Sequence, residues 1–518
     1  MSFQVIESNS LRGCGSQVFS GRQWLGSVTL PFRSLLQQSK VYEKLTICTP
    51  PTLLGYMWTG EDMINDQGIE IPARRDTSFM NVFITLDPAI SLSDDQTAKY
   101  GDQKPLWLFS TDEDEDLLNL TYEYEKQCKV AAGRVKKRVI TTVINSEGRL
   151  VLAHRFFKPL PPPQEVVLDT PDNSMSVLER VAAFVSLIPT LSFPSDVGDS
   201  GEMWLTSEQC LELAMGNDVS LAVVLCNFFH DLTVNVWLLL GTSVIEGETA
   251  YVLTQENTWF VLWNPRDGKH YQSYDSFCPL KTVDCLINGE NVWFHLQPTR
   301  KMPITFDVSN NATWKPLFPK GFNSDSSSMP TEIKYRPTQI DLVNHLQRRY
   351  VKMDSIFKAM HCFQRLKCRT ISFMVLSVPS MNFILHRMEM KLKSCVMDWR
   401  SPHPTRWSPR CAAMLSEVTQ KLERNPASDT IALELDRLLD TMKDYKVTGF
   451  PIHMAYQDMS TVIEAVYNTR IHSTEIPGTE FALSTYIHPY PNHILSVWIF
   501  LATLVKHQHG VFNVPSVH

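Results

Sequence analysis

Residues 216–241 read GNDVSLAVVLCNFFHDLTVNVWLLLG, and this stretch decides the fold that the sequence predicts. It begins with a small polar turn, continues from Val219 with apolar residues at helical spacing, and ends in a run typical of a buried strand. Several cysteine enzymes present their nucleophile in this way, at the start of a helix that precedes a strand. Here the helix start offers Asp218, because the cysteine of this stretch, Cys226, lies two turns further along. The stretch therefore indicates an enzyme scaffold whose nucleophile is either elsewhere or lost.

The composition is that of a globular protein. The 518 residues are 43% hydrophobic and 20% charged, which suits roughly two to four domains with buried cores. A net charge of −7 argues against a general binder of nucleic acid or anionic membranes. The N-terminus lacks a signal-peptide pattern, and the apolar run at 494–505 is shorter than the about 20 residues of a membrane span. We therefore expect a soluble intracellular protein.

The 11 cysteines are scattered, without the paired spacing of a zinc site. In a chain without a secretion signal, reduced thiols are the default. The late histidines, from His453 to His509, also lack the tight spacing of metal ligands. The sequence therefore predicts neither a metal nor a cofactor.

Strand patterns and composition shifts divide the chain into five segments. These are 1–90, the last part of a β domain with about four strands; 91–130, an acidic linker; 131–318, an α+β domain; 319–398, a Ser/Pro-rich loop and a helix; and 399–518, a compact α+β region. The acidic run Asp112–Asp116 lacks the ligand spacing and turn glycine of a calcium loop, so we interpret it as solvated.

Local signals give the elements of the middle domain. We expect a hairpin over 138–157, a helix over 174–188, and a second helix opened by a capping box from Thr206 to Gln209. Asn217 or Asp218 is suited to cap the next helix, and strands over 234–240, 249–253 and 259–263 follow. Further on, 339–356 and 411–444 have helical patterns. Helices followed by strands predict an α+β fold.

Cysteine chemistry needs a thiolate, a histidine that takes its proton, and a group that orients the histidine. Cys226 and His230 are four residues apart on one helix face, which leaves a displaced Cys226/His230 pair as an alternative site. Cys226 lies among apolar residues, however, and core burial is the simpler interpretation. Asp267, His270 and Cys278 are interpreted as turn and loop residues. The chain holds no phosphate-binding loop, nucleophile elbow or HExxH motif.

Nine short stretches, in order from about residue 20 onward, resemble the C-terminal half of the coiled-coil and C2 domain-containing protein 2 family, its B branch more than its A branch. They are Arg22-Gln-Trp-Leu-Gly26, Pro51-Thr-Leu-Leu-Gly-Tyr56, Ala222-Val-Val-Leu-Cys-Asn227, Thr249-Ala-Tyr-Val-Leu-Thr254, Trp263-Asn-Pro265, Phe277-Cys-Pro-Leu280, Asp398-Trp-Arg400, Gly449-Phe-Pro451 and Tyr486-Ile-His-Pro-Tyr-Pro491.

The resemblance implies a coiled-coil region, a C2 domain and an inactive transglutaminase-like domain, in a structural protein of the ciliary transition zone at the basal body. On this basis residues 1–90 are the C-terminal part of a C2-type β-sandwich, and 131–318 are a transglutaminase/papain-like domain. The coiled-coil part is absent, and the stretch 356–387 is interpreted as an insertion. The expected Cys, His and Asp positions are occupied by Asp218, Thr249 and Asn264.

The sequence therefore predicts a pseudoenzyme scaffold without catalytic residues. Its expected partners are other transition-zone proteins, with an extended peptide or a tubulin tail as candidate ligands of the old substrate groove. Nucleic-acid binding is not expected, and lipid binding is expected to be weak or absent because the first half of the C2 domain is missing. The alternative is a cysteine hydrolase or acyltransferase that uses Cys226 and His230.

Overall fold

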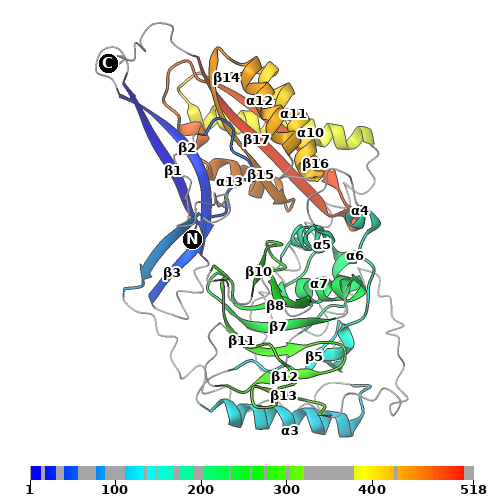
Figure 1. The fold of residues 1–518 in the computed structure, drawn as a ribbon. Helices are drawn as coiled ribbons and strands as arrows, with labels where there is room; N and C mark the ends of the chain where they lie inside the picture. Colours follow the sequence, from blue (N-terminus) through cyan, green and yellow to red (C-terminus); the bar gives the residue numbers. More distant parts are fainter. Residues whose placement is uncertain are drawn as a thin grey trace, which may run out of the picture.

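The computed structural model describes most of the chain. The described residues are 2–12, 18–30, 40–56, 78–87, 111–133, 137–146, 149–168, 176–190, 203–232, 235–256, 259–272, 275, 277–297, 304–319, 378–424 and 429–506. They form two units, each with its own sheet, and two hairpins near the N-terminus (Figure 1). The predicted helix at 339–356 and the part of the predicted insertion before residue 378 lie outside the described residues.

The first unit is built on a seven-stranded antiparallel sheet in the order β10-β9-β8-β7-β11-β12-β13. The strands are β7 (Val236–Ser243), β8 (Gly247–Glu256), β9 (Trp259–Trp263), β10 (His270–Gln272), β11 (Leu280–Ile287), β12 (Val292–His295) and β13 (Trp314–Pro316). Helix α7 (Asp218–Leu232) packs on one face with α5 (Val177–Ser186) and α6 (Ser207–Leu213). A second apolar cluster, which includes Phe306 and Trp314, covers the other face. The sheet is therefore buried on both sides.

The predicted capping box at the start of the second helix is confirmed, and the first helix begins with a capping box that was not predicted. Ser176 opens α5 and Thr206 opens α6, and each forms a complete capping box with the residue three positions later. The predicted hairpin is present as β5 (Thr142–Ile144) and β6 (Leu150–Leu152), followed by the short helix η2 (Ala153–Phe156). The short helix α4 (Gln164–Val167) follows. The mixed α+β class is confirmed by these elements and the large antiparallel sheet, while the C2 and transglutaminase-like architectures stay predictions.

The acidic segment differs from the solvated linker that was predicted. Helix α3 (Glu115–Ala132) occupies its second part and lies along the sheet edge at β13 (Figure 1), where the Tyr124 hydroxyl donates to the Lys315 carbonyl at 2.7 Å. Asp114 caps this helix through its carboxylate. Glu113 is buried and binds the Arg155 guanidinium through both oxygens, at 2.7 Å each. Composition suggested a linker because Arg155, the partner of Glu113, lies 42 residues further along the chain.

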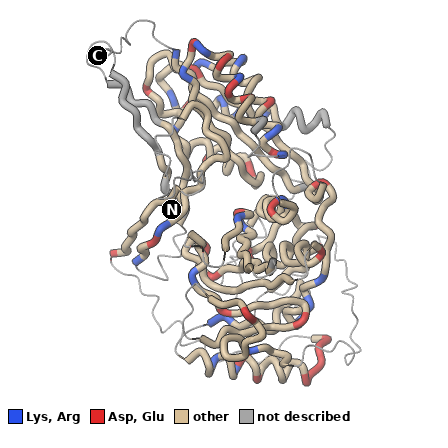
Figure 2. The backbone as a smooth tube through the Cα atoms, in the orientation of Figure 1, with Lys and Arg blue, Asp and Glu red and all other residues tan. Residues whose placement is uncertain are grey.

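The second unit has a four-stranded sheet in the order β14-β16-β17-β15, with helices on both faces. Its elements are α10 (Val378–Arg400), β14 (Arg406–Trp407), α11 (Pro409–Arg424), α12 (Asp429–Thr441), β15 (Tyr445–Ala455), α13 (Met459–Asn468), η4 (Ile471–Ser473), β16 (Glu480–Pro489), η5 (Pro491–His493) and β17 (Leu495–Lys506). Acidic and basic side chains are mixed along α11 and α12 (Figure 2).

Two predictions for this region need correction. The helical pattern at 411–444 is divided between α11 and α12, because the chain must reverse to place both on the same sheet face. The last part of the predicted insertion, from residue 378, begins α10, and its Leu385 packs on the opposite sheet face beside Met388 and Leu392 of the same helix. This part therefore belongs to the second unit.

The N-terminal region has four described strands in two antiparallel pairs, but about four strands were predicted within 22–88, and the first strand seen lies before that range. The pairs are β1 (Ser2–Arg12) with β2 (Val18–Thr29) and β3 (Lys40–Thr46) with β4 (Phe79–Thr85). Trp24 of β2 contacts Phe450 of the second unit at 4.8 Å between ring centroids. The β3–β4 pair packs near Val244 and Ile245 of the first unit. None of the described helices combines the length and apolar composition that a membrane span requires.

The buried pair of Glu113 and Arg155 provides a stability test. Replacing Glu113 by Ala leaves the guanidinium and the Leu152 amide without their acceptor, so we expect unfolding free energy to fall by about 3 kcal/mol. The matched control is Asp112→Ala, which removes an exposed pair with Arg149 and should cost less than about 1 kcal/mol. Urea denaturation of both variants measures the difference, and equal losses would contradict the structural role of Glu113.

Candidate site at the start of helix α7

The start of α7 is fixed by Asn217. The Asn217 side-chain oxygen accepts from the Ser220 amide at 2.7 Å, and its carbonyl accepts from the Leu221 amide. Asn217 is therefore the N-cap, and Asp218 is the first residue inside the helix. Of the two caps that the sequence allowed, the structure selects Asn217, and the Asp218 carboxylate is left to interact elsewhere.

The turn before α7 is too tight for a side chain. A Cβ atom on Gly216 would lie 2.8 Å from the Cys210 sulfur and 3.1 Å from Cβ of Ser220. The Gly216 amide donates to the Pro189 carbonyl at 3.2 Å, which ties the turn to the end of α5. Position 218 is thereby held against the end of α6 and the sheet.

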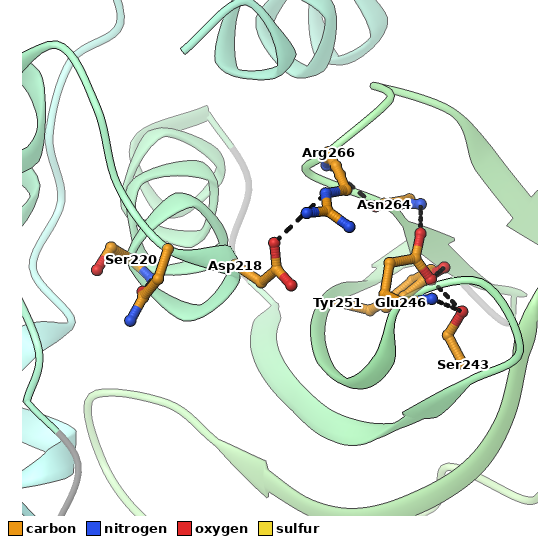
Figure 3. Close-up of polar contacts among 8 residues, drawn as sticks. Asp218, Ser220, Ser243, Glu246, Tyr251, Asn264 and Arg266 are labelled. Carbon is orange, nitrogen blue, oxygen red and sulfur yellow. Dashed lines mark hydrogen bonds and ion pairs between the residues drawn. The ribbon is translucent and has the colours of Figure 1, made fainter. Parts of the chain in front are cut away.

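Asp218 forms an ion pair that the sequence did not predict. Its Oδ1 atom lies 3.6 Å from Nε of Arg266, and Figure 3 shows the two side chains pointing toward one another. Burial raises the pKa of the Asp218 carboxyl above its usual range, while the Arg266 and Arg138 charges oppose that shift. The carboxylate is therefore held in a partly desolvated place with cations as its neighbours.

Arg266 is positioned by Asn264. The Asn264 side-chain oxygen accepts from the Arg266 amide at 3.0 Å in the turn after β9. The Asn264 amide group donates to Glu246 at 3.0 Å, and Glu246 also accepts from Ser243 and from the Tyr251 hydroxyl (Figure 3). Asn264 therefore joins Asp218 only indirectly, through the turn that carries Arg266.

Thr249, predicted to occupy the histidine position of a lost triad, lies on the sheet face that points away from α7. On β8, Ala250 and Val252 face the core under α7, whereas Tyr251 and Leu253 belong to the opposite core. Alternation along the strand places Thr249 with Tyr251, away from α7. The sequence motif located Thr249 along the strand but did not determine the sheet face to which its side chain points, because a shift of one residue moves a side chain to the other face. The structure does not bring Thr249 to Asp218.

The structure does not favour the alternative Cys226/His230 site. Cys226 is 1% exposed and packs in the core under α7. Burial raises the pKa of its thiol well above the ordinary value, which disfavours the thiolate that attack requires. His230 is exposed at the end of the helix. The two residues therefore share a helix and not an environment.

The second thiol of this region, Cys210, was not considered from the sequence. It lies beside Gly216, donates to the Met215 carbonyl, and has its pKa raised to about 12 by burial. No signal in the sequence marks this position, because Cys210 belongs to the preceding helix, α6, and comes next to the turn only in the folded structure. It is a core thiol next to the place where a nucleophile would stand.

The loop residues Asp267, His270 and Cys278 do not form one group. His270 lies 3.8 Å from Glu179 of α5 and contacts the Trp263 ring. Burial raises the pKa of Asp267 to about 6 and that of Cys278 to about 12, and both lie near Glu246. These two residues are therefore on the Glu246 side and lie in turns or loops as interpreted, whereas His270 begins strand β10.

The assembled site offers carboxylates, an amide, hydroxyls and guanidinium groups. Such a set can hold charged or hydrogen-bonding groups of a ligand, but none of the thiols described near the turn is both exposed and acidic. Among the described residues, no three His, Cys, Asp or Glu side chains are grouped as ligands of a metal ion. The absence of a metal and of a cofactor stays a prediction.

Comparison with known families defines the class of protein first. Residues 202–317, which contain α7 and its sheet, match the CEP76 peptidase-like domain. Residues 377–506 match the C-terminal domain of the centrosomal protein of 76 kDa. The two units therefore correspond to a peptidase-like domain followed by a domain of centrosomal type, and α10 falls inside the second match, as its packing does.

Two relatives then identify the family. The chain is 38% identical over 513 residues to human Protein CC2D2B, covering 98% of this chain and 32% of that protein. It is 23% identical over 493 residues to the coiled-coil and C2 domain-containing protein 2A of Drosophila melanogaster, covering 93% and 33%. The chain belongs to the coiled-coil and C2 domain-containing protein 2 family, with higher identity to the B relative than to the A relative. It spans about a third of the length of these relatives.

Thiol reactivity tests the burial of Cys226. We expect iodoacetamide to alkylate exposed Cys48 in the folded protein and to leave Cys226 and Cys210 unmodified until denaturant is added. Mass spectrometry of tryptic peptides after short exposure measures each site. Rapid native-state alkylation of Cys226 would show that the thiol is accessible and would revive the alternative site.

The raised pKa of Asp218 predicts that its ionised carboxylate lowers the free energy of unfolding by an amount that depends on pH. A carboxyl whose pKa is higher in the folded state than in the unfolded state favours folding when protonated, and this advantage is lost as pH rises through both values. Asp218→Asn should therefore be more stable than the unmodified protein at pH 7, with the difference shrinking toward acid pH. The exposed Glu248→Gln variant is the control. A less stable Asp218→Asn protein at pH 7, measured by urea denaturation, would show that the Arg266 pair outweighs burial.

Proposed function

We propose that this chain is part of a non-enzymatic scaffold at the base of the cilium, in the transition zone, where it supports cilium assembly. Its peptidase-like domain is a degenerate transglutaminase-like domain that binds protein or peptide and does not cleave it. Its partners are other transition-zone proteins, and an extended peptide such as a tubulin tail is a candidate ligand. Nucleic acid is not a partner, and binding to lipid is weak.

The observation that carries the proposal is the ion pair of Asp218 with Arg266 at the start of α7. A cysteine enzyme of this type holds a thiolate there, together with a histidine that accepts its proton. A carboxylate paired with a guanidinium offers no sulfur nucleophile. The thiols beside it, Cys210 and Cys226, are buried with raised pKa values. Membership of the family supplies the ciliary location.

Two measurements test the proposal. A peptide-based thiol-directed activity probe should label none of the buried cysteines, and labelling that Cys226→Ala abolishes would contradict the non-enzymatic role. In cells that lack the protein, the full-length form should locate beside a basal-body marker and restore ciliation. Full-length protein with Asp218→Asn should restore ciliation equally, because no catalytic step depends on this carboxylate.

A matched variant makes the cell experiment decisive. Gly241→Leu would place a side chain against the Thr282 carbonyl, 2.0 Å from the first added carbon, and should disrupt the sheet. We expect this variant to lose both location and ciliation. Loss of ciliation in Asp218→Asn at normal protein level and location would instead indicate that the carboxylate does chemistry.

A further inference from the structure

A cavity of about 1060 Å³ lies between the two units and the N-terminal hairpin. We call it the inter-unit cavity. Its lining includes Trp24 of β2, Glu165 of α4, Phe184 of α5, and Glu423, His453 and Trp498 of the second unit. It is separate from the Asp218 site, whose residues are not part of this lining. Its volume is at the upper end of the range for ligand pockets, about 300–1000 Å³, so it can hold several residues of an extended chain.

One wall of the cavity is aromatic. The His453 ring stacks on Trp498 with centroids 4.1 Å apart and planes at 14°. Tyr490 contacts His488 at 4.6 Å and Phe184 at 5.4 Å between ring centroids. Ring faces carry partial negative charge and attract cations. Leu168, an exposed residue, adds an apolar rim.

A carboxylate lies within this wall. Glu423 accepts hydrogen bonds from the Tyr490 hydroxyl, at 2.6 Å, from the Ser496 hydroxyl and from the Trp498 ring nitrogen. All three donors are neutral, so they orient the carboxylate without cancelling its charge. Glu423 and Glu165 both raise the pKa of the Tyr490 hydroxyl, beyond the effect of burial, which places both acids near one phenol.

The lining also holds two arginines, which keep their positive charge, but among the described residues Glu423 has no ion pair with either of them. The Arg180 guanidinium donates to the carbonyls of Val166 and Val167, at 3.0 and 3.1 Å, and so fixes the end of α4. Arg424 is exposed and lies at the rim. Around Glu423 the lining therefore combines aromatic rings with a carboxylate that lacks an ion pair among the described residues, and exposed Glu165 adds a second carboxylate; aromatic rings beside a carboxylate are the chemistry that recognises a cationic group.

We propose that the inter-unit cavity binds an arginine or lysine side chain from an extended, basic segment of a partner protein. The cation lies against the ring faces near Glu423 and Glu165, and neighbouring residues of the segment fill the remaining volume. An acidic segment is disfavoured by the same two carboxylates. The site adds a second binding function that does not depend on the peptidase-like domain being inactive.

The experiment uses fluorescence anisotropy with the whole chain and fluorescein-labelled peptides of ten residues. One peptide alternates arginine with glycine, a second has lysine in place of arginine, and a third has glutamate. We expect the basic peptides to bind and the acidic peptide to show no saturable binding. Glu165→Gln should weaken binding of the arginine peptide about fivefold, and Glu423→Gln tenfold or more, since 1.4 kcal/mol corresponds to a factor of ten.

The control separates a site from general attraction by the net negative chain. Glu417 is exposed on α11, the same helix as Glu423, and is not part of the lining. Glu417→Gln makes the same charge change and should leave affinity unchanged, while Arg424→Gln should strengthen binding. Equal weakening by Glu417→Gln and Glu165→Gln, or equal binding of acidic and basic peptides, would overturn the proposal. Glu165 is exposed, so its variant stays informative even if Glu423→Gln fails to fold.

Discussion

The burial of helix α7 is the constraint on which the first unit depends. Every residue from Val219 to Phe229 is buried, because the helix packs on β7 and β8 on one side and on α5 and α6 on the other. Full burial of one large apolar side chain contributes about 1.5–3 kcal/mol, so the position of this helix is strongly fixed. The polar turn at the start of α7 is therefore also fixed in position. Asp218 is held in place by a core that has no room to move it.

Local chemistry made much of the fold predictable. Helical spacing in 219–229, the capping box at Thr206 and alternation in the strands are all short-range signals, and the structure confirms them. The boundaries at 90, 130, 318 and 398 stay predictions, since no comparison tests them. The acidic segment shows what composition cannot predict. A high density of charge does not reveal that Glu113 forms an ion pair with an arginine distant in the sequence.

The candidate site was only half predictable for the same reason. A motif located Asp218 and Asn264, but it could not reveal that Arg266, in the turn after β9, would form an ion pair with the Asp218 carboxylate. Glu246, which binds Asn264, gave no signal beyond its place in a turn. The face on which Thr249 lies depends on strand register, and register is decided by pairing partners. Which side chains contact one another depends on the tertiary structure, and these contacts cannot be inferred from a single sequence.

Tyr490 has a consequence for how the two units are joined. Its ring contacts Phe184 of the first unit, while its hydroxyl is bonded to Glu423 of the second. The adjacent Ile494 lies in the same apolar cluster as α5. Tyr490 therefore bridges the two units, because a substitution that removes its ring and hydroxyl takes away a packing contact of α5 and a hydrogen bond to α11 together.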